Sequence, residues 1–264
     1  MKRPSALKAP FLKRVSLIEG KADGDEFPFN RLAFLRRPDF SLDFPSRVTF
    51  FVGENGTGKS TLLEAIAELC EFPAEGGSQD HRGSAGASPP GGRLAEALRP
   101  SWLPRVRSGF YLRAESFFNL AGFLDEVGDV DMSGGRKLHA QSHGESVLAL
   151  LSNRLGSMER GVILMDEPEA ALSPSRQLAF LGLLHQWDMS ETVQLVIATH
   201  APIILCYPGA TLYRFDEDGI SETPVEHTEH YRVTKAFLSN PERYLAEIFD
   251  ETGAGHTGSI AESD

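Results

Sequence analysis

The segment VTFFVGENGTGKST, residues 48–61, decides the fold of this chain. Its central part, GENGTGKS (53–60), fits the phosphate-loop pattern G-x-x-x-x-G-K-[ST] at every position. The apolar run 48–53 predicts a β-strand, and apolar residues at helical spacing predict a helix over 59–72. This pattern requires a strand before it and a helix after it, so the context indicates a loop that binds phosphate groups. The alternative, a turn without a ligand, leaves Lys59 at a helix N-terminus with no anion to pair with.

The residues of this loop have distinct expected roles. Glycines allow successive backbone N–H groups to point at phosphate oxygens, and the helix N-terminus adds the positive end of its dipole. Lys59 supplies a positive charge to the β- and γ-phosphates, and the Ser60 hydroxyl is expected to ligate Mg²⁺. We therefore expect ATP and Mg²⁺ as cofactors. The expected nucleotide-binding residues of this segment are Gly53, Glu54, Asn55, Gly56, Thr57, Gly58, Lys59, Ser60 and Thr61.

Apolar strands and amphipathic helices alternate along the rest of the chain. Strands are predicted over 106–112, 161–168 and 193–200, and helices over 115–127, 145–155 and 174–188. This alternation indicates an α/β fold with a mostly parallel core sheet flanked by helices.

The flanks of this core predict further elements. They are extra strands at an antiparallel β edge over 11–20 and 40–47, a hairpin turn at Asp218 and Gly219, and one or two closing helices over 230–249. We expect a single domain over 1–250, with loops near 73–92 and 127–140 and a disordered tail over 251–264.

Two acidic residues end one of the predicted buried strands. VILMDEPEAAL places Asp166 and Glu167 at the carboxyl end of that strand, the edge where parallel sheets bind ligands. Asp166 is expected to belong to the Mg²⁺ shell, and Glu167 to polarise the attacking water. A third acidic residue, Glu169, is interpreted as a cap of the next turn. His200 ends the following strand and is expected to contact the γ-phosphate or the attacking water, which makes Lys59, Glu167 and His200 the expected catalytic set.

Composition and charge narrow the class of protein. The chain has 264 residues, of which 41% are hydrophobic and 24% charged, ordinary values for a globular protein. Its net charge of −11 argues against indiscriminate coating of nucleic acid, although residues 1–50 are basic on balance. The two cysteines, Cys70 and Cys206, form no metal or disulfide pattern. Apolar runs of membrane-spanning length are missing from the sequence, so we expect a cytoplasmic protein without direct membrane insertion.

These motifs, in this order, resemble those of the ATP-binding-cassette class of P-loop ATPases. The resemblance adds QSHGES (141–146), which lies where this class carries an LSGGQ-like signature at a helix start. Ser142 and Gly144 match that pattern, whereas His143 and Glu145 depart from it. The family implies that this helical signature region contacts the γ-phosphate of the other copy in a head-to-tail, ATP-dependent homodimer. From the residues alone, Ser142 and Glu145 also form a capping box.

Two features of many cassette ATPases have no clear counterpart in this sequence. The first is a glutamine between the phosphate loop and the signature, for which Glu115 is a candidate substitute near Mg²⁺ or simply an acid favoured at a helix N-terminus. The second is the aromatic residue that stacks on adenine in transporter subunits. Phe27, Phe29 and Phe34 are its candidates, and core packing is the simpler interpretation of each.

The runs LRAESFFN, DEPEAALSP and ATHAPI resemble more closely a group of small stand-alone bacterial ATPases, usually described only as predicted ATPases. This resemblance covers about residues 11–250 and implies ATP hydrolysis for an unassigned task, in the manner of DNA-repair-like or defence-like ATPases. The interval from Lys59 to Ser142 leaves no room for the long coiled coil of chromosome-maintenance ATPases. Two alternatives stay open, a nucleotide-gated binding module with little turnover and the ATP-binding subunit of a membrane transporter. No protein partner is identified by the sequence.

A local basic stretch interrupts the acidic average. It has two interpretations, a contact with nucleic acid or a partner protein, and an ordinary solvated face with salt bridges. Its residues are Arg93, Arg99, Arg105, Arg107 and Arg113, with Trp102 among them.

Overall fold

The structure is a computed structural model that describes residues 7–21, 26–74, 76–79, 90–113, 148, 151–156 and 158–254. The predicted helix 115–127, Glu115 and the signature residues Ser142 and Gly144 lie outside these ranges. The helix predicted over 145–155 is described mainly by its last turn, Leu151–Leu155, which is π-helical.

Six strands form the central sheet, in the order β5-β6-β7-β3-β8-β9. All neighbours run parallel except β8 and β9, which form the hairpin expected around Asp218 and Gly219. This confirms the α/β class and the mostly parallel sheet. The antiparallel edge of the sheet is the β8–β9 hairpin and not the strands expected over 11–20 and 40–47. The strands are β3 (Val48–Gly53), β5 (Gly109–Arg113), β6 (Gly161–Asp166), β7 (Val193–Ala198), β8 (Thr211–Asp216) and β9 (Gly219–Glu222).

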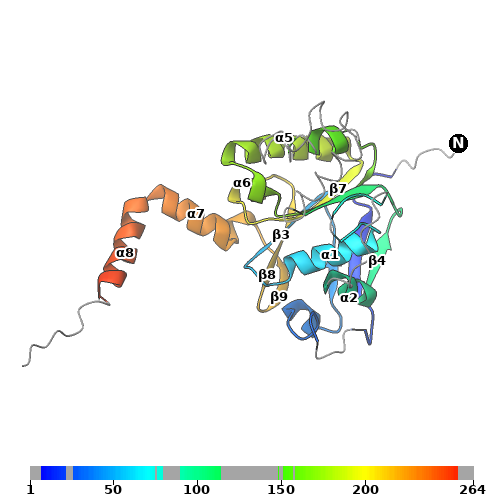
Figure 1. Cartoon of the computed structure of the whole chain (residues 1–264), viewed down its shortest axis with the longest axis horizontal. Helices are drawn as coiled ribbons and strands as arrows, with labels where there is room; N and C mark the ends of the chain where they lie inside the picture. The colour runs from blue at the N-terminus through cyan, green and yellow to red at the C-terminus, as the bar shows by residue number, and fades with distance from the viewer. Residues whose placement is uncertain are drawn as a thin grey trace, which may run out of the picture.

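Helices cover both faces of this sheet (Figure 1). As a result, β3, β6 and β7 are buried along their whole length. Successive side chains alternate between two apolar clusters. Phe51 packs toward α1 (Lys59–Leu69) and α2 (Pro90–Ala97), whereas Phe50 packs toward α5 (Pro174–Ser190) and α6 (Pro202–Leu205). The continuous apolar runs of the sequence thus correspond to strands that are covered on both sides.

The N-terminal strands do not join the central sheet. β1 (Leu12–Leu17) pairs antiparallel with β2 (Ser41–Asp43) and β4 (Leu98–Trp102), in a separate three-stranded sheet. The side chain of Gln194 in β7 connects this sheet to the core, since its Oε1 accepts hydrogen bonds from the backbone N–H groups of Phe11 and Leu12 at 2.8 Å.

Two elements, a strand and a helix, were not predicted from the sequence at these positions. β4 was not predicted, because Arg99 and Pro100 interrupt its apolar pattern. α2 starts at Pro90, within the segment expected to be a loop, and Pro is well suited to the first position of a helix.

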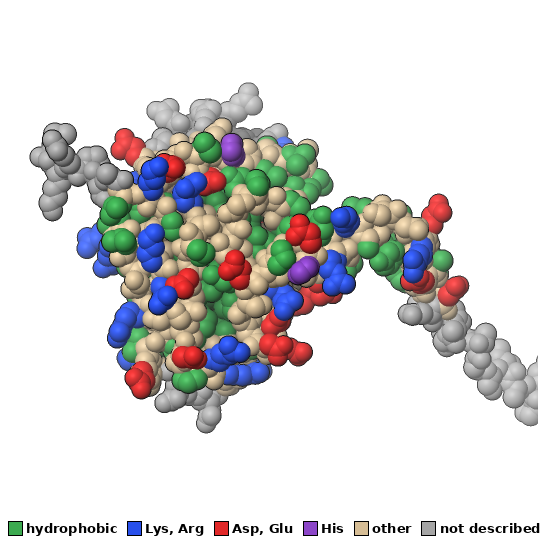
Figure 2. All heavy atoms as spheres, turned by 180° about the vertical axis from the view of Figure 1, so that it is seen from behind, with side chains coloured by type: hydrophobic (Ala, Val, Ile, Leu, Met, Phe, Trp, Pro, Cys, Tyr) green, Lys and Arg blue, Asp and Glu red, His purple; other side chains and the backbone are tan. Residues whose placement is uncertain are grey.

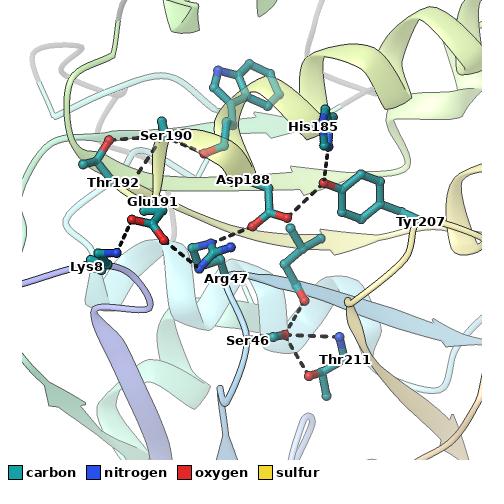
Figure 3. Close-up of polar contacts among 12 residues, drawn as sticks. Lys8, Ser46, Arg47, His185, Asp188, Ser190, Glu191, Thr192, Tyr207 and Thr211 are labelled. Carbon is teal, nitrogen blue, oxygen red and sulfur yellow. Dashed lines mark hydrogen bonds and ion pairs between the residues drawn. The ribbon is translucent and has the colours of Figure 1, made fainter.

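A polar network lies near the amino end of β3, opposite the end that continues into the phosphate loop (Figure 3). The Arg47 Nε donates to Asp188 Oδ1 at 2.6 Å, and the Tyr207 hydroxyl donates to Asp188 Oδ2 at 3.0 Å. Burial, reinforced by the Asp188 bond, raises the pKa of Tyr207 to about 12. Lys8 and Glu191 form an ion pair beside this network, so the N-terminal segment is fastened to the end of α5.

The chain ends in two helices that leave the body of the molecule (Figure 1). α7 (Glu229–Ser239) and α8 (Pro241–Ala254) confirm the helices expected over 230–249, but they project outward instead of closing over the core. Among the described helices, none is long and apolar enough to cross a membrane.

Candidate functional site

The phosphate loop connects the end of β3 to the start of α1, as the sequence predicts. Gly53 has φ +151°, and a Cβ built there would lie 2.2 Å from the backbone oxygen of Phe215. Gly58 precedes α1 with φ +99°, and a Cβ there would lie 2.6 Å from the Leu32 side chain. Both positions therefore require glycine, because the backbone conformation and the close neighbours exclude a side chain.

Lys59 is buried inside the loop and is 4% exposed. Its Nζ donates hydrogen bonds to the backbone oxygens of Gly53 at 2.7 Å and Glu54 at 3.0 Å. Burial lowers the pKa of Lys59, and the nearby carboxylates of Glu167 and Asp166 oppose that shift. A buried ammonium group that donates hydrogen bonds to neutral carbonyl oxygens is well placed to bind an anion.

Ser60 and Asp166, the two predicted metal ligands, lie together at the carboxyl edge of the sheet. The Ser60 Oγ donates a hydrogen bond to Asp166 Oδ1 at 3.0 Å. Burial raises the pKa of Asp166 to about 6, while the Ser60 bond and the charge of Arg113 act in the opposite direction. A hydroxyl and a carboxylate are oxygen ligands of the kind that Mg²⁺ prefers, so these residues fit the ion.

Glu167 directly follows β6 and has a backbone conformation that is uncommon for a residue with a side chain. Its φ is +51°, and its backbone N–H donates to the oxygen of Ala198 at 2.9 Å. This turn leaves the Glu167 side chain 43% exposed, with Oε1 3.3 Å from the Nε2 of His200. Backbone conformations of this kind are concentrated at functional sites, where the surrounding structure holds them in place.

His200 follows β7 and lies between the acidic residues and α7. Its Nδ1 is 2.9 Å from the Nε2 of His230, so one ring nitrogen of this pair donates and the other accepts. Burial lowers the pKa of His200, and the charges of Lys59 and His230 lower it further. These effects favour the neutral ring, which can both accept and donate a hydrogen bond.

Two residues of this site were not predicted as functional. Glu169, which was interpreted as a cap, accepts a hydrogen bond from the backbone N–H of His200 at 2.5 Å through its Oε1. Burial raises the pKa of Glu169. His230 was placed in a closing helix, and no local motif marks it, because its contact with His200 depends on where α7 begins.

The three candidates for stacking on adenine differ in their burial. Phe34 is buried and packs against Phe40 and Phe215, whereas Phe27 is 39% exposed. Phe29 is partly buried against the core. Core packing is thus the observed role of Phe34 and Phe29.

Three arginines of the basic stretch lie beside acidic residues. Arg93 pairs with Glu26, Arg105 with Glu71, and Arg113 with Glu64. These contacts favour the interpretation of a solvated face with salt bridges over a nucleic-acid surface.

Comparisons with known proteins find several that are similar to parts of this chain. A family model described as an AAA domain matches residues 32–85, which include the whole phosphate loop. The probable siderophore transport system ATP-binding protein YusV of Bacillus subtilis is 27% identical over 188 residues, which cover 64% of this chain and 67% of that protein. The DNA replication and repair protein RecF of Leptospira interrogans is 58% identical, but only over 36 residues, 14% of this chain and 10% of that protein.

Among solved structures, a putative metal-chelate type ABC transporter in an inward-facing conformation matches with a TM-score of 0.48 at 18% identity, covering 84% of this chain and 88% of that chain. The SMC head domain of Thermotoga maritima matches with a TM-score of 0.45 at 16% identity, covering 81% and 99%.

Proposed function

We propose that this chain, which is similar to P-loop ATPases of the ATP-binding-cassette class, binds Mg-ATP and hydrolyses it to ADP and phosphate. The observation that carries this proposal is the convergence of Lys59, Ser60, Asp166, Glu167 and His200 at one edge of the sheet. The phosphate loop and the two acidic residues are more than 100 positions apart in sequence, and the hydrogen bond between Ser60 and Asp166 joins them.

Each of these residues has a role in the proposed reaction. Lys59 exchanges its bonds to the Gly53 and Glu54 carbonyls for phosphate oxygens, while the backbone N–H groups of the loop orient the same phosphates. Ser60 and Asp166 would hold Mg²⁺, which would supply positive charge at the β- and γ-phosphates. Glu167 orients the attacking water and accepts its proton, and His200 donates a hydrogen bond toward the γ-phosphate.

The simplest test is the release of inorganic phosphate at steady state. We expect turnover by the wild type and its loss in Lys59→Ala and in Glu167→Gln, with Lys235→Ala, which removes an exposed lysine of α7, as the matched control. The Glu167→Gln variant should still bind ATP, because its phosphate loop is intact. If Lys59→Ala releases phosphate as fast as the wild type, the proposed hydrolysis is wrong. ATP binding without turnover in the wild type would favour the nucleotide-gated clamp.

The signature residues Ser142 and Gly144 extend this proposal to a second copy of the chain. In a head-to-tail homodimer each site uses the phosphate loop of one copy and the signature of the other. Support comes from the family resemblance, in which Ser142 and Gly144 match the signature pattern.

Mixing two inactive variants tests whether the sites are shared. Lys59→Ala damages one phosphate loop and Ser142→Phe blocks one signature, so a mixed dimer retains one intact site. We expect each variant to be inactive alone and a one-to-one mixture to recover up to about a quarter of the wild-type rate. A mixture that stays inactive would contradict a site built from two copies.

The task that hydrolysis drives is not identified by this site. A DNA-repair-like or defence-like role, and action with an unidentified protein partner in the cytoplasm, remain part of the proposal. The transporter alternative has support from the siderophore-system relative and predicts that the chain co-purifies with a membrane-spanning protein.

A further inference from the structure

The two C-terminal helices form an arm, residues 229–254, that has little support from the rest of the molecule. α7 contains no buried residue, and every residue from Pro241 to Asp250 except Tyr244 is exposed. The arm keeps a defined bend, because the rings of Phe237 and Tyr244 pack edge to face with centroids 6.0 Å apart.

Large apolar side chains lie exposed along the arm, and apolar atoms line its surface in Figure 2. Leu238 is 68% exposed, Val233 54% and Leu245 38%. Ile248 and Phe249 are also exposed. Scattered apolar residues are normal on a protein surface, but here they are concentrated on two short helices.

Helices of this length need a packing partner to be stable. α7 has 11 residues and α8 has 14, close to the lower limit of about 12–15 residues at which an isolated helix is even marginally stable in water. Most helical stability in proteins comes from packing apolar side chains, so the exposed apolar side chains of the arm predict that another surface covers them.

The charges of the two helices are complementary to each other. By sequence, α7 carries Arg232 and Lys235 against one acid, for a net charge of +1. α8 carries one arginine against four acids, for a net charge of −3. In a two-fold antiparallel pairing of two arms, α7 of each copy lies against α8 of the other, so the basic helix meets the acidic helix twice.

We propose that the arm is a docking surface for the arm of a second copy of this chain, and that this contact forms without nucleotide. The pairing buries the apolar faces of four helices between two copies. With four aromatic side chains in each arm, it provides apolar area on the order of the ~800 Å² per partner that stable interfaces bury. The contact is separate from the phosphate loop and does not depend on hydrolysis.

Sedimentation of the full chain without nucleotide and without magnesium tests this proposal. We expect the wild type to be a dimer at about 100 μM and Leu238→Asp to raise its dissociation constant by about tenfold or more. Leu178→Asp is the matched control, because Leu178 on α5 is 60% exposed, and it should leave the dimer unchanged. Retained phosphate release by Leu238→Asp shows that the body of the molecule is folded.

Charge reversal tests the orientation of the pairing. We expect the double variant R232E/K235E to weaken the dimer by about tenfold or more, and the further changes E247K/D250K to restore it, since the two helices then exchange their charges.

A wild type that sediments as a monomer without nucleotide would overturn the proposal, and so would a Leu238→Asp variant that dimerises as tightly as the wild type. Both results are independent of phosphate release, so failure of the arm contact and failure of ATP hydrolysis are measured separately.

Discussion

Glu169 is a partly buried carboxylate that touches no reacting group in the proposed chemistry, yet it forms a hydrogen bond with the backbone of His200. Its Oε1 accepts the backbone N–H of His200, which connects the turn after β6 to the end of β7. Glu167 precedes the same turn, so this bond lies next to two residues of the proposed catalytic site, Glu167 and His200. We interpret Glu169 as a positioning residue.

Replacing Glu169 separates its hydrogen bond from its charge. Glu169→Ala should lower the free energy of unfolding by about 1–3 kcal/mol, because the backbone N–H of His200 loses its acceptor. Glu169→Gln keeps an oxygen acceptor and should retain most of that stability. Urea unfolding of both variants beside the wild type measures the difference, and equal losses in the two variants would contradict the role of the hydrogen bond.

The effect of Glu169→Gln on the free energy of unfolding should depend on pH. Burial raises the pKa of Glu169 in the folded state, so its contribution to stability is present below the unfolded pKa and is lost as pH rises through the folded pKa. The amide that replaces the carboxyl group has no proton to lose over this range. The free energy of unfolding of Glu169→Gln relative to wild type should therefore increase from about pH 4 to about pH 8, and a constant difference would contradict the raised pKa.

How much of the site the sequence predicts depends on how local each contact is. Lys59 and Ser60 are fixed by a motif of eight residues, and Asp166 and Glu167 by their position after an apolar strand. The functional contacts of Glu169 and His230 were missed, because each contact depends on how a turn or helix is placed relative to the next strand, and periodicity does not determine that placement.

At the scale of elements, α7 has a direct contact with the proposed catalytic site. His230 in its first turn lies 2.9 Å from His200 and 4.0 Å from Glu54 of the phosphate loop. The first turn of α7 therefore lies where a change in the orientation of the His200 ring would alter its contact with His230.

We expect His230→Phe to lower the hydrolysis rate by about tenfold, because His200 loses the nitrogen that orients its ring while the aromatic packing is kept. The KM for ATP should change little, since Lys59 and the loop are untouched. Phosphate release measured over a range of ATP concentrations separates the two parameters, with His227→Phe on the exposed turn before α7 as the control. A loss confined to KM would contradict this role of His230.

A fully buried side chain, that of Gln194, helps to join the two sheets, beside the hydrogen bond from the Tyr213 hydroxyl to the backbone oxygen of Asp43. Gln194 in β7 makes three hydrogen bonds to the N-terminal segment, two as acceptor from Phe11 and Leu12 and one as donor to the backbone oxygen of Leu12 at 2.9 Å. The sequence predicted β1 but not its separate sheet, because a glutamine in an apolar run gives no sign of its partners. This long-range contact, not local propensity, decides where the N-terminal strand lies.

Gln194→Leu should lower the free energy of unfolding by about 3 kcal/mol, because three buried backbone groups of Phe11 and Leu12 lose their hydrogen bonds. Gln177→Leu is a control with a smaller effect, since Gln177 makes one partly buried bond to the oxygen of Leu172. Urea titrations report both values. An effect of Gln194→Leu no larger than that of Gln177→Leu would show that the buried amide is not what fastens the sheets together.

For the whole molecule, the net charge of −11 coexists with a proposed site for a polyanion. Binding depends on local groups, the buried Lys59 ammonium and the N–H groups at the start of α1, so the overall charge does not exclude ATP.

Nucleotide binding should stabilise the folded state, and thermal unfolding of the whole molecule tests this. A ligand that binds only the folded state at about 100 times its dissociation constant adds about 2.7 kcal/mol of stability. For a chain of this size we therefore expect saturating Mg-ATP to raise the Tm by roughly 5–10 °C. Lys59→Ala should lose most of this rise, because it removes the charge that binds the phosphates, and chelation of magnesium should reduce it in the wild type. An equal rise in Lys59→Ala would mean that the nucleotide stabilises the protein from a different site, since the buried ammonium at the centre of the phosphate loop would then not take part in binding.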